Sequence, residues 1–161
     1  MHVVSDADVI IHLSKLKKLS LLKSLYNEVA VPEHVKSEII TKEDSELQEA
    51  FHSFLKAFAT SKDKADEIVK RHNIHIGEAH VKALGEELKA TLFLSNERKV
   101  MKAAKEEGFA VSGTIGIILK AAKIGLIEKS EANALFEKMK TRDFRIHPDI
   151  LQKAINTIKE M

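Results

Sequence analysis

The segment HVVSDADVIIHLSKL, residues 2–16, decides the fold of this chain. Its first four residues are a run rich in β-branched side chains that stops at Asp6, and apolar residues then recur at helical spacing from Val9 to Leu16. The pattern predicts a strand over 2–5, an acidic turn and a helix. A strand that leads directly into a helix is the first half of a unit in which helical crossovers join parallel strands.

The same alternation continues along the chain. Further strands are predicted at EVAVP (28–32), ATLFLS (90–95) and FAVSG (109–113). Helices are predicted over 19–25, 32–40, 43–58, 62–72, 77–89, 98–107, 115–123, 129–140 and 148–160. In the helix over 43–58, Phe51, Phe54 and Phe58 are expected to form a packing stripe. We therefore expect an α/β fold, three-layer α/β/α with a mostly parallel central sheet, in a single domain over 1–161 that closes with the helices of 129–161.

Composition excludes several classes of protein. Lys and Arg number 26 against 24 Asp and Glu, a net charge of +2, so the chain is not a strongly basic nucleic-acid coat protein. With no Cys, it has neither a disulfide scaffold nor a thiolate nucleophile nor a Cys-based zinc site. No apolar run approaches the roughly 18 residues that span a bilayer, and no signal peptide is evident. We expect a cytoplasmic protein with no membrane partner.

Acidic residues fall where the predicted strands end. Asp6 follows the first strand directly, and Glu97 lies two residues beyond the strand at 90–95. Glu38 lies on the helix after strand 28–32, and Glu78 opens the helix that precedes strand 90–95. Ligands of parallel α/β sheets bind at the carboxyl ends of the strands, so these acids are expected to converge there. Crowded carboxylates repel one another, and a hard divalent cation such as Mg²⁺ or Mn²⁺ relieves that repulsion.

Two segments, 3–40 and 77–127, resemble the PIN-domain family, in particular its compact, stand-alone prokaryotic and archaeal branch of toxin-type ribonucleases. The sequences that carry the resemblance are VVSDADVI, VPEHVKSEII, GEAHVKAL and FLSNERKV. The resemblance to PIN domains implies a metal-dependent endoribonuclease, often the toxin of a toxin–antitoxin pair.

The composition also resembles that of heat-adapted proteins, since the chain has no Trp, few Gln and many Lys and Glu.

Residue by residue, the resemblance implies a catalytic set of Asp6, Glu38, Glu78 and Glu97. Asp6, Glu78 and Glu97 would hold Mg²⁺ or Mn²⁺, and Glu38 would act through water. Ser95 and Asn96 would support the site from the end of the strand. Glu97 stands where the family usually has Asp, and Asn96 replaces a second acid found in near relatives.

The expected partners follow from the same resemblance. Basic residues near the acids are expected to line a phosphate path, namely Lys15, Lys17, Lys18, Lys36, Arg98, Lys99 and Lys102. Of these, Lys15, Lys36, Arg98 and Lys99 are the predicted nucleic-acid ligands. The partners would be single-stranded or structured RNA, an antitoxin protein and a second copy of the chain in a homodimer.

Three alternatives stay open. The departures at Asn96 and Glu97 are also those expected of a catalytically weak PIN-like module that binds RNA or protein. Asp6-Ala7-Asp8-Val9 also resembles the nucleophile motif of haloacid dehalogenase-like phosphatases, although 109–116 lacks their late acidic pair. In the PIN-like interpretation, Asp8 is expected to cap the helix after the first strand rather than to act in the metal site. The third alternative is a zinc site at His72, His75 and His80, but their spacing matches no established ligand pattern, so a structural or solvated role is favoured for them.

Overall fold

The computed structural model describes residues 2–41 and 43–161. The chain divides into two compact units, the first ending at Gly113 and the second beginning at Thr114. The predicted single domain over 1–161 remains a prediction. No described helix is long and apolar enough to cross a membrane.

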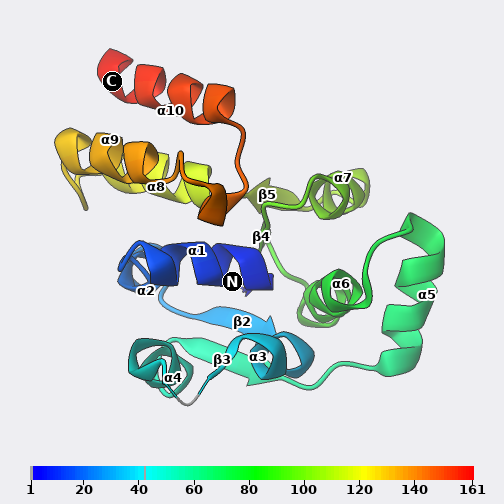
Figure 1. Ribbon diagram of the computed structural model, residues 1–161. Helices are drawn as coiled ribbons and strands as arrows, with labels where there is room; N and C mark the ends of the chain where they lie inside the picture. The colour runs from blue at the N-terminus through cyan, green and yellow to red at the C-terminus, as the bar shows by residue number, and fades with distance from the viewer. Residues whose placement is uncertain (1, 42) are drawn as a thin grey trace. The chain divides into compact units, whose positions relative to one another are not determined.

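The first unit contains a parallel sheet with strand order β3-β2-β1-β4-β5 (Figure 1). The strands that the structure describes are β1 (Val3–Ser5), β2 (Val29–Pro32), β3 (Leu55–Phe58), β4 (Leu92–Leu94) and β5 (Ala110–Ser112). Every pair of neighbours is parallel, and Val4 of β1 lies opposite Ala30 of β2 and Phe93 of β4. The expected mostly parallel sheet is confirmed, and β1 with its buried residues is its centre.

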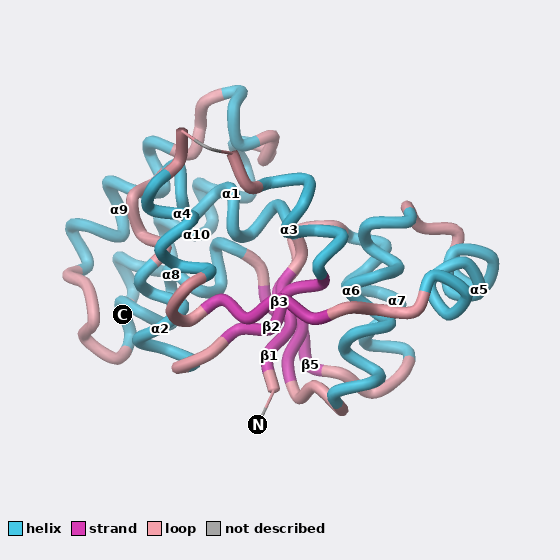
Figure 2. Tube along the Cα trace, turned by 90° about the horizontal axis from the view of Figure 1, so that it is seen from below, coloured by secondary structure: helices cyan, strands magenta, loops and turns pink. Residues whose placement is uncertain are grey.

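Helices cover both faces of this sheet. The chain moves outward from β1 through β2 to β3, returns to β4 and then moves outward to β5. Because crossover connections are right-handed, the two directions of travel place their helices on opposite faces. Figure 2 shows α6 and α7 on one side of the strands and α1, α2 and α4 on the other. The helices of this unit are α1 (Ala7–Lys15), α2 (Ser20–Tyr26), α3 (Glu33–Ile39), α4 (Ser45–Phe51), α5 (Lys62–His72), α6 (Ile76–Leu88) and α7 (Arg98–Glu106). The predicted three-layer α/β/α class is confirmed.

The strand order reverses between β1 and β4, and this position fixes where a ligand can bind. At such a switch point the loops after the two strands turn to opposite faces and leave a crevice at the carboxyl edge. Asp6 follows β1, and Ser95, Asn96 and Glu97 follow β4. The fold thus brings the predicted acids of two distant segments to one edge.

The helix predicted over 43–58 is wrong in its second half. The helix α4 ends at Phe51, and Leu55–Phe58 forms the edge strand β3, whose four residues pair with the four residues of β2. Leu55 is fully buried in this pairing, while Phe58 is 37% exposed at the other end of the strand. The expected stripe of Phe51, Phe54 and Phe58 is therefore not a helical face, because pairing with β2 overrides the local helical pattern.

Close packing joins α6 to the sheet. A β-carbon added at Gly85 would lie 2.1 and 2.2 Å from ring atoms of Phe93, a residue that is fully buried in β4. Only glycine lets the helix backbone approach the ring this closely. On the opposite face, α1 buries Val9, Ile10 and Leu13.

A buried ammonium group joins α6 to the end of α7. Lys82 is fully buried, and its Nζ lies 2.9 Å from Glu86 and also contacts the carboxylate of Glu107. Glu107 in addition contacts Arg71 at 3.3 Å and His72 at 3.1 Å. The network compensates the desolvation of Lys82, which would otherwise be costly.

The second unit is helical in its described residues. It consists of α8 (Thr114–Lys123), α9 (Lys129–Lys138), a 3-10 turn (Arg142–Phe144) and α10 (Pro148–Glu160). The chain leaves α8 through Gly125, whose φ of +82° suits glycine. The helices predicted over 115–123, 129–140 and 148–160 are confirmed to within two residues.

Candidate metal centre

Asp6 is the central residue of the candidate site. It follows β1, where its backbone N–H donates to the carbonyl of Leu94 at 2.9 Å. Its Oδ1 accepts the N–H of Val9 at 3.1 Å, so it is Asp6 that caps α1. Its Oδ2 has no hydrogen-bond partner although the residue is only 4% exposed. A buried carboxylate oxygen without a partner is costly, which makes this atom a candidate ligand for a cation.

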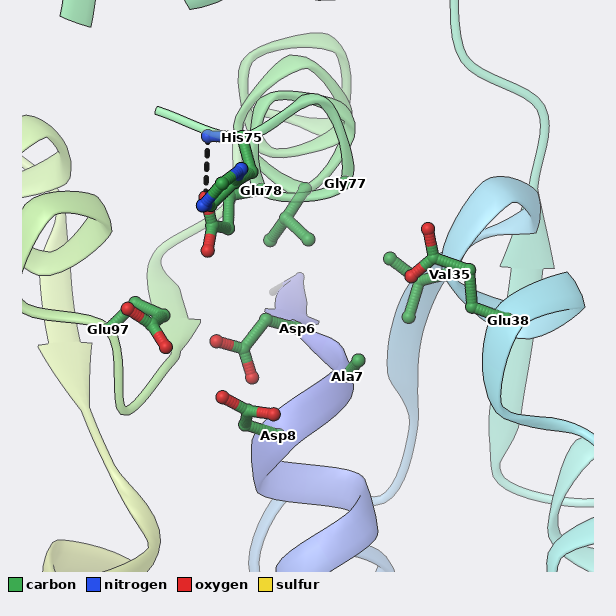
Figure 3. A pocket seen from close by; sticks show the side chains of 10 residues that line it. Asp6, Ala7, Asp8, Val35, Glu38, His75, Gly77, Glu78 and Glu97 are labelled. Carbon is green, nitrogen blue, oxygen red and sulfur yellow. Dashed lines mark hydrogen bonds between the residues drawn. The ribbon is translucent and has the colours of Figure 1, made fainter. Parts of the chain in front are cut away.

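Asp6 lies in an acidic cavity of about 190 Å³ at the carboxyl edge of the sheet. We use the name acidic cavity for the hollow lined by Asp6, Ala7, Asp8, Val35, Glu38, His75, Gly77, Glu78, Val81 and Glu97. Figure 3 shows the side chains of Asp6, Asp8 and Glu97 turned toward one another, with Glu78 nearby. The described lining includes five carboxylates and neither Lys nor Arg. The prediction that the acids at the strand ends meet in one crevice agrees with this lining.

Asp8 lines the cavity, contrary to the expectation that it caps α1. The cap position is one residue after β1 and belongs to Asp6, so Asp8 lies in the first turn of the helix. It is half-buried there, and its charge adds to that of its neighbours. The sequence could have indicated that Asp8 is not the cap, because α1 begins immediately after Asp6 and Asp8 is the second residue of the helix.

Glu78 is held at the start of α6. Its Oε2 accepts the backbone N–H of His75 at 2.7 Å, drawn as the dashed line in Figure 3. A Glu at the third helical position often reaches back in this way. His75, which the sequence favoured as structural or solvated, lines the cavity beside it.

Glu97 is placed by the loop after β4. The hydroxyl oxygen of Ser95, a fully buried residue, accepts the N–H of Glu97 at 3.1 Å. The amide of Asn96 lies 3.0 Å from Nδ1 of His12, a buried residue of α1. A β-carbon at Gly113 would lie 2.6 Å from Oδ1 of Asn96, so glycine is needed beside it. These contacts join the loop that carries Glu97 to the helix that follows Asp6.

Glu38 stands apart from the other acids. Figure 3 shows it on α3, on the far side of Ala7 from Asp6 and Glu97. Its Oε1 lies 2.9 Å from Nε2 of His34, which is one turn earlier on the same helix. The ring of His34 stacks on that of His80, with centroids 4.4 Å apart. The Glu38 side chain is 50% exposed and lines the cavity from one wall.

Burial and mutual repulsion act on the charges of these acids. Burial raises the pKa of Asp6 to about 7, and the charges of Asp8 and Glu97 raise it further, against the lowering effect of the nearby Ser95 hydroxyl and of the Val9 N–H. Partial burial also raises the pKa of Glu97, as do the charges of Glu78 and Asp8. The fold thus concentrates negative charge without a compensating cationic side chain in the described lining.

The donor set suits a hard divalent cation. It consists of carboxylate oxygens, the ligands that Mg²⁺ and Mn²⁺ prefer, and it includes the unpartnered Oδ2 of Asp6. Among the described residues, no three His, Asp or Glu side chains are already arranged so that they could hold an ion. Glu78 and Glu97 are more exposed than Asp6, whose Oδ1 is held by the N–H of Val9. The predicted ligation by Asp6, Glu78 and Glu97 stays a prediction.

The predicted basic ligands lie in different places. Arg98 and Lys99 are exposed at the start of α7, next to Glu97. Lys15 ends α1, about 13 Å along the helix axis from Asp6. Lys36 lies with its Nζ 5.2 Å from the ring centroid of Phe51. None of the four is among the described residues that line the acidic cavity.

Comparison with known families identifies the class of protein. A family model described as a PIN domain matches residues 2–160, so the chain belongs to the PIN-domain family. PIN domains are generally nucleases and typically use divalent metal ions. Neither a search of curated proteins nor a search of solved structures gives a match to this chain.

Proposed function

We infer that this protein is a metal-dependent endoribonuclease that hydrolyses RNA phosphodiester bonds in the acidic cavity. The observation that carries the inference is the buried, unpartnered Oδ2 of Asp6 among four other carboxylates at the switch point of a PIN-domain sheet. A site that served only folding would gain no stability from the repulsion among these carboxylates, whereas a cation site needs their negative charge.

Asp6, Glu78 and Glu97 would hold Mg²⁺ or Mn²⁺. When bound, the ion would supply a nucleophile activated at neutral pH and would neutralise charge on the phosphate. Asp6 must lose its proton to serve as a ligand, which its pKa of about 7 permits at and above neutral pH. The Glu38 side chain is 50% exposed and can meet a water molecule, so Glu38 is suited to orient the attacking water or to accept its proton.

The test is cleavage of end-labelled single-stranded RNA in Mn²⁺ by the wild-type protein, with EDTA as the control for the metal. Asp6→Asn retains the helix cap and removes the charge. Glu78→Gln retains the capping hydrogen bond, and Glu87→Gln, at an exposed position nine residues later on α6, is its matched control. We expect cleavage that EDTA, Asp6→Asn and Glu78→Gln abolish and that Glu87→Gln leaves unchanged. Cleavage that persists in Asp6→Asn would overturn the proposal.

The proposal also includes two partners, an antitoxin protein and a second copy of the chain in a homodimer. As a toxin, the wild-type protein would arrest growth when expressed without an antitoxin, and Asp6→Asn would not. A homodimer would give twice the chain mass in light scattering, and a monomer would refute that part alone.

A second function is favoured by two observations. The described side chains form no ready-made group of three metal ligands, and Asn96 and Glu97 depart from the family pattern. A catalytically weak module that binds RNA or protein fits these features. It predicts RNA binding without cleavage in Mn²⁺, so the cleavage assay distinguishes the two functions.

A further inference from the structure

Two further hollows adjoin the acidic cavity on the side of α7. The first, of about 330 Å³, shares His75, Glu78 and Glu97 with the acidic cavity and is also lined by Arg98 and Lys99. The second, of about 300 Å³, shares Lys99 with the first. Because each hollow shares at least one lining residue with the next, the three are neighbours in a series along the surface. We call the two added hollows the α7 groove.

The charge along this series changes sign. The acidic cavity is lined by carboxylates without Lys or Arg among the described residues. In the α7 groove Arg98 and Lys99 first balance Glu78 and Glu97, and Arg71, Lys99 and Lys102 then outnumber Glu106. A cation would be attracted to one end of the series and a polyanion to the other.

The positive charges of α7 are available to a ligand. Arg98, Lys99 and Lys102 are exposed and form no ion pair with a described residue. Positions 98 and 102, and positions 99 and 102, are neighbours on a helix surface. The opposite face of α7 is buried through Val100, Ala103 and Ala104, so the basic face is fixed outward. Arg71 differs, since it is held by Glu86 and Glu107 at 3.3 Å each.

We propose that an RNA strand leaves the acidic cavity past His75 and runs along the α7 groove, with its phosphates on Arg98, Lys99 and Lys102. The inference rests on the proposed function for the choice of RNA, and it adds the path that the strand takes over the surface. Phosphate contacts of this kind fix position and carry no sequence information. Lys15 and Lys36 lie outside the series, so the path uses only the Arg98 and Lys99 part of the basic set expected from sequence.

The test measures binding of fluorescent single-stranded RNA by anisotropy between 50 and 200 mM salt, in the Asp6→Asn background to prevent cleavage. The test variant is Lys99→Gln with Lys102→Gln. The charge-matched control is Lys23→Gln with Lys89→Gln, two exposed lysines on the segments that lead into the amino ends of β2 and β4. Thermal unfolding of each variant verifies that it folds.

We expect the test variant to weaken binding for every RNA sequence. The slope of log affinity against log salt should fall by about 1.4, at roughly 0.7 for each phosphate of a single strand that a lysine no longer neutralises. The control pair should retain the wild-type slope. Equal slopes in the two variants, or no RNA binding at 50 mM salt, would each overturn the proposed path.

The outcome is separable from that of the proposed function. Cleavage depends on Asp6 and the metal, and binding in the α7 groove is measured without cleavage. RNA binding that depends on Lys99 and Lys102 would support the path even if the wild-type protein cleaved nothing. Conversely, Mn²⁺-dependent cleavage with an unchanged salt slope would retain the nuclease and refute the path.

Discussion

The carboxylate of Glu78 accepts a 2.7 Å hydrogen bond from the backbone N–H of His75, and both residues border the acidic cavity and the α7 groove. The same carboxylate therefore stabilises the start of α6 and faces the candidate metal site. Its two roles can be separated by substitution, since Gln retains the hydrogen bond and loses the charge.

We expect Glu78→Gln to leave the free energy of unfolding nearly unchanged in metal-free buffer. Glu78→Ala should lower it by about 1 kcal/mol, the usual cost of removing a helix cap. Urea unfolding of both variants measures the difference. Equal destabilisation by Gln and Ala would mean that the charge, rather than the cap, stabilises α6.

The buried position of Asp6 makes stability depend on pH. A carboxyl whose pKa is higher in the folded state binds its proton more tightly when folded, so it costs stability as pH rises from the unfolded value of about 4 to the folded value of about 7. The full difference between the folded and unfolded pKa values corresponds to roughly 4 kcal/mol of lost folding stability at pH 8.

In EDTA, Asp6→Asn should therefore be more stable than the wild type at pH 8 and nearly equal to it at pH 4. Urea unfolding at pH 4, 6 and 8 measures the gap between the two proteins. A gap that does not widen with pH would show that Asp6 is not held in a desolvated site.

The network around Lys82 gives the opposite pH dependence. Burial by itself would raise the pKa of Glu107, but hydrogen bonds from Lys82 and His72 lower it to about 2. A depressed pKa contributes stability above the unfolded value, near 4.3, that is lost as pH falls toward 2. Lys82→Met should reduce the stability lost between pH 6 and pH 2.5, as measured by urea unfolding. Lys64 contacts only Glu86 of the two carboxylates that Lys82 contacts, so the Lys64→Met variant should still lose as much stability over this pH range as the wild type. An identical loss in both variants would exclude the role of Lys82.

The approach of α6 to the sheet is tested at Gly85. Alanine there would place a methyl group against the ring of Phe93, which typically costs about 1–3 kcal/mol, against roughly 1 kcal/mol gained from helix propensity. We expect Gly85→Ala to lower the urea midpoint and Glu87→Ala, at an exposed position on α6, to leave it within error. A higher midpoint for Gly85→Ala would mean that the helix and the sheet do not pack as closely as described.

Local sequence rules predicted the core of the fold and the acidic edge. A β-branched run before Asp6, and acids just after β4 and at the start of α6, place the carboxylates at one edge as soon as the strands are taken as parallel. Glu38 was included because it lies on the helix after the strand at 28–32, and the resemblance to PIN domains gave it a role through water; the structure places it apart from the other acids.

Features that depend on long-range contacts were not predictable. The local pattern predicts a helix at Leu55–Phe58, and this segment becomes the strand β3 only by pairing with β2. The contact of Asn96 with His12 joins residues 84 positions apart, and the burial of Lys82 depends on Glu107, 25 positions away. No local pattern indicates such pairs.

Mn²⁺ binding tests the central claim most directly. Isothermal titration calorimetry at pH 8 compares the wild-type protein with Asp6→Asn and with the Glu87→Gln control. We predict that the wild type and Glu87→Gln bind Mn²⁺ alike, and that Asp6→Asn binds it at least about tenfold more weakly, because Asp6 supplies a buried, unpartnered carboxylate oxygen to the site. Equal Mn²⁺ affinity in the wild type and Asp6→Asn would contradict the assignment of the acidic cavity as a metal centre.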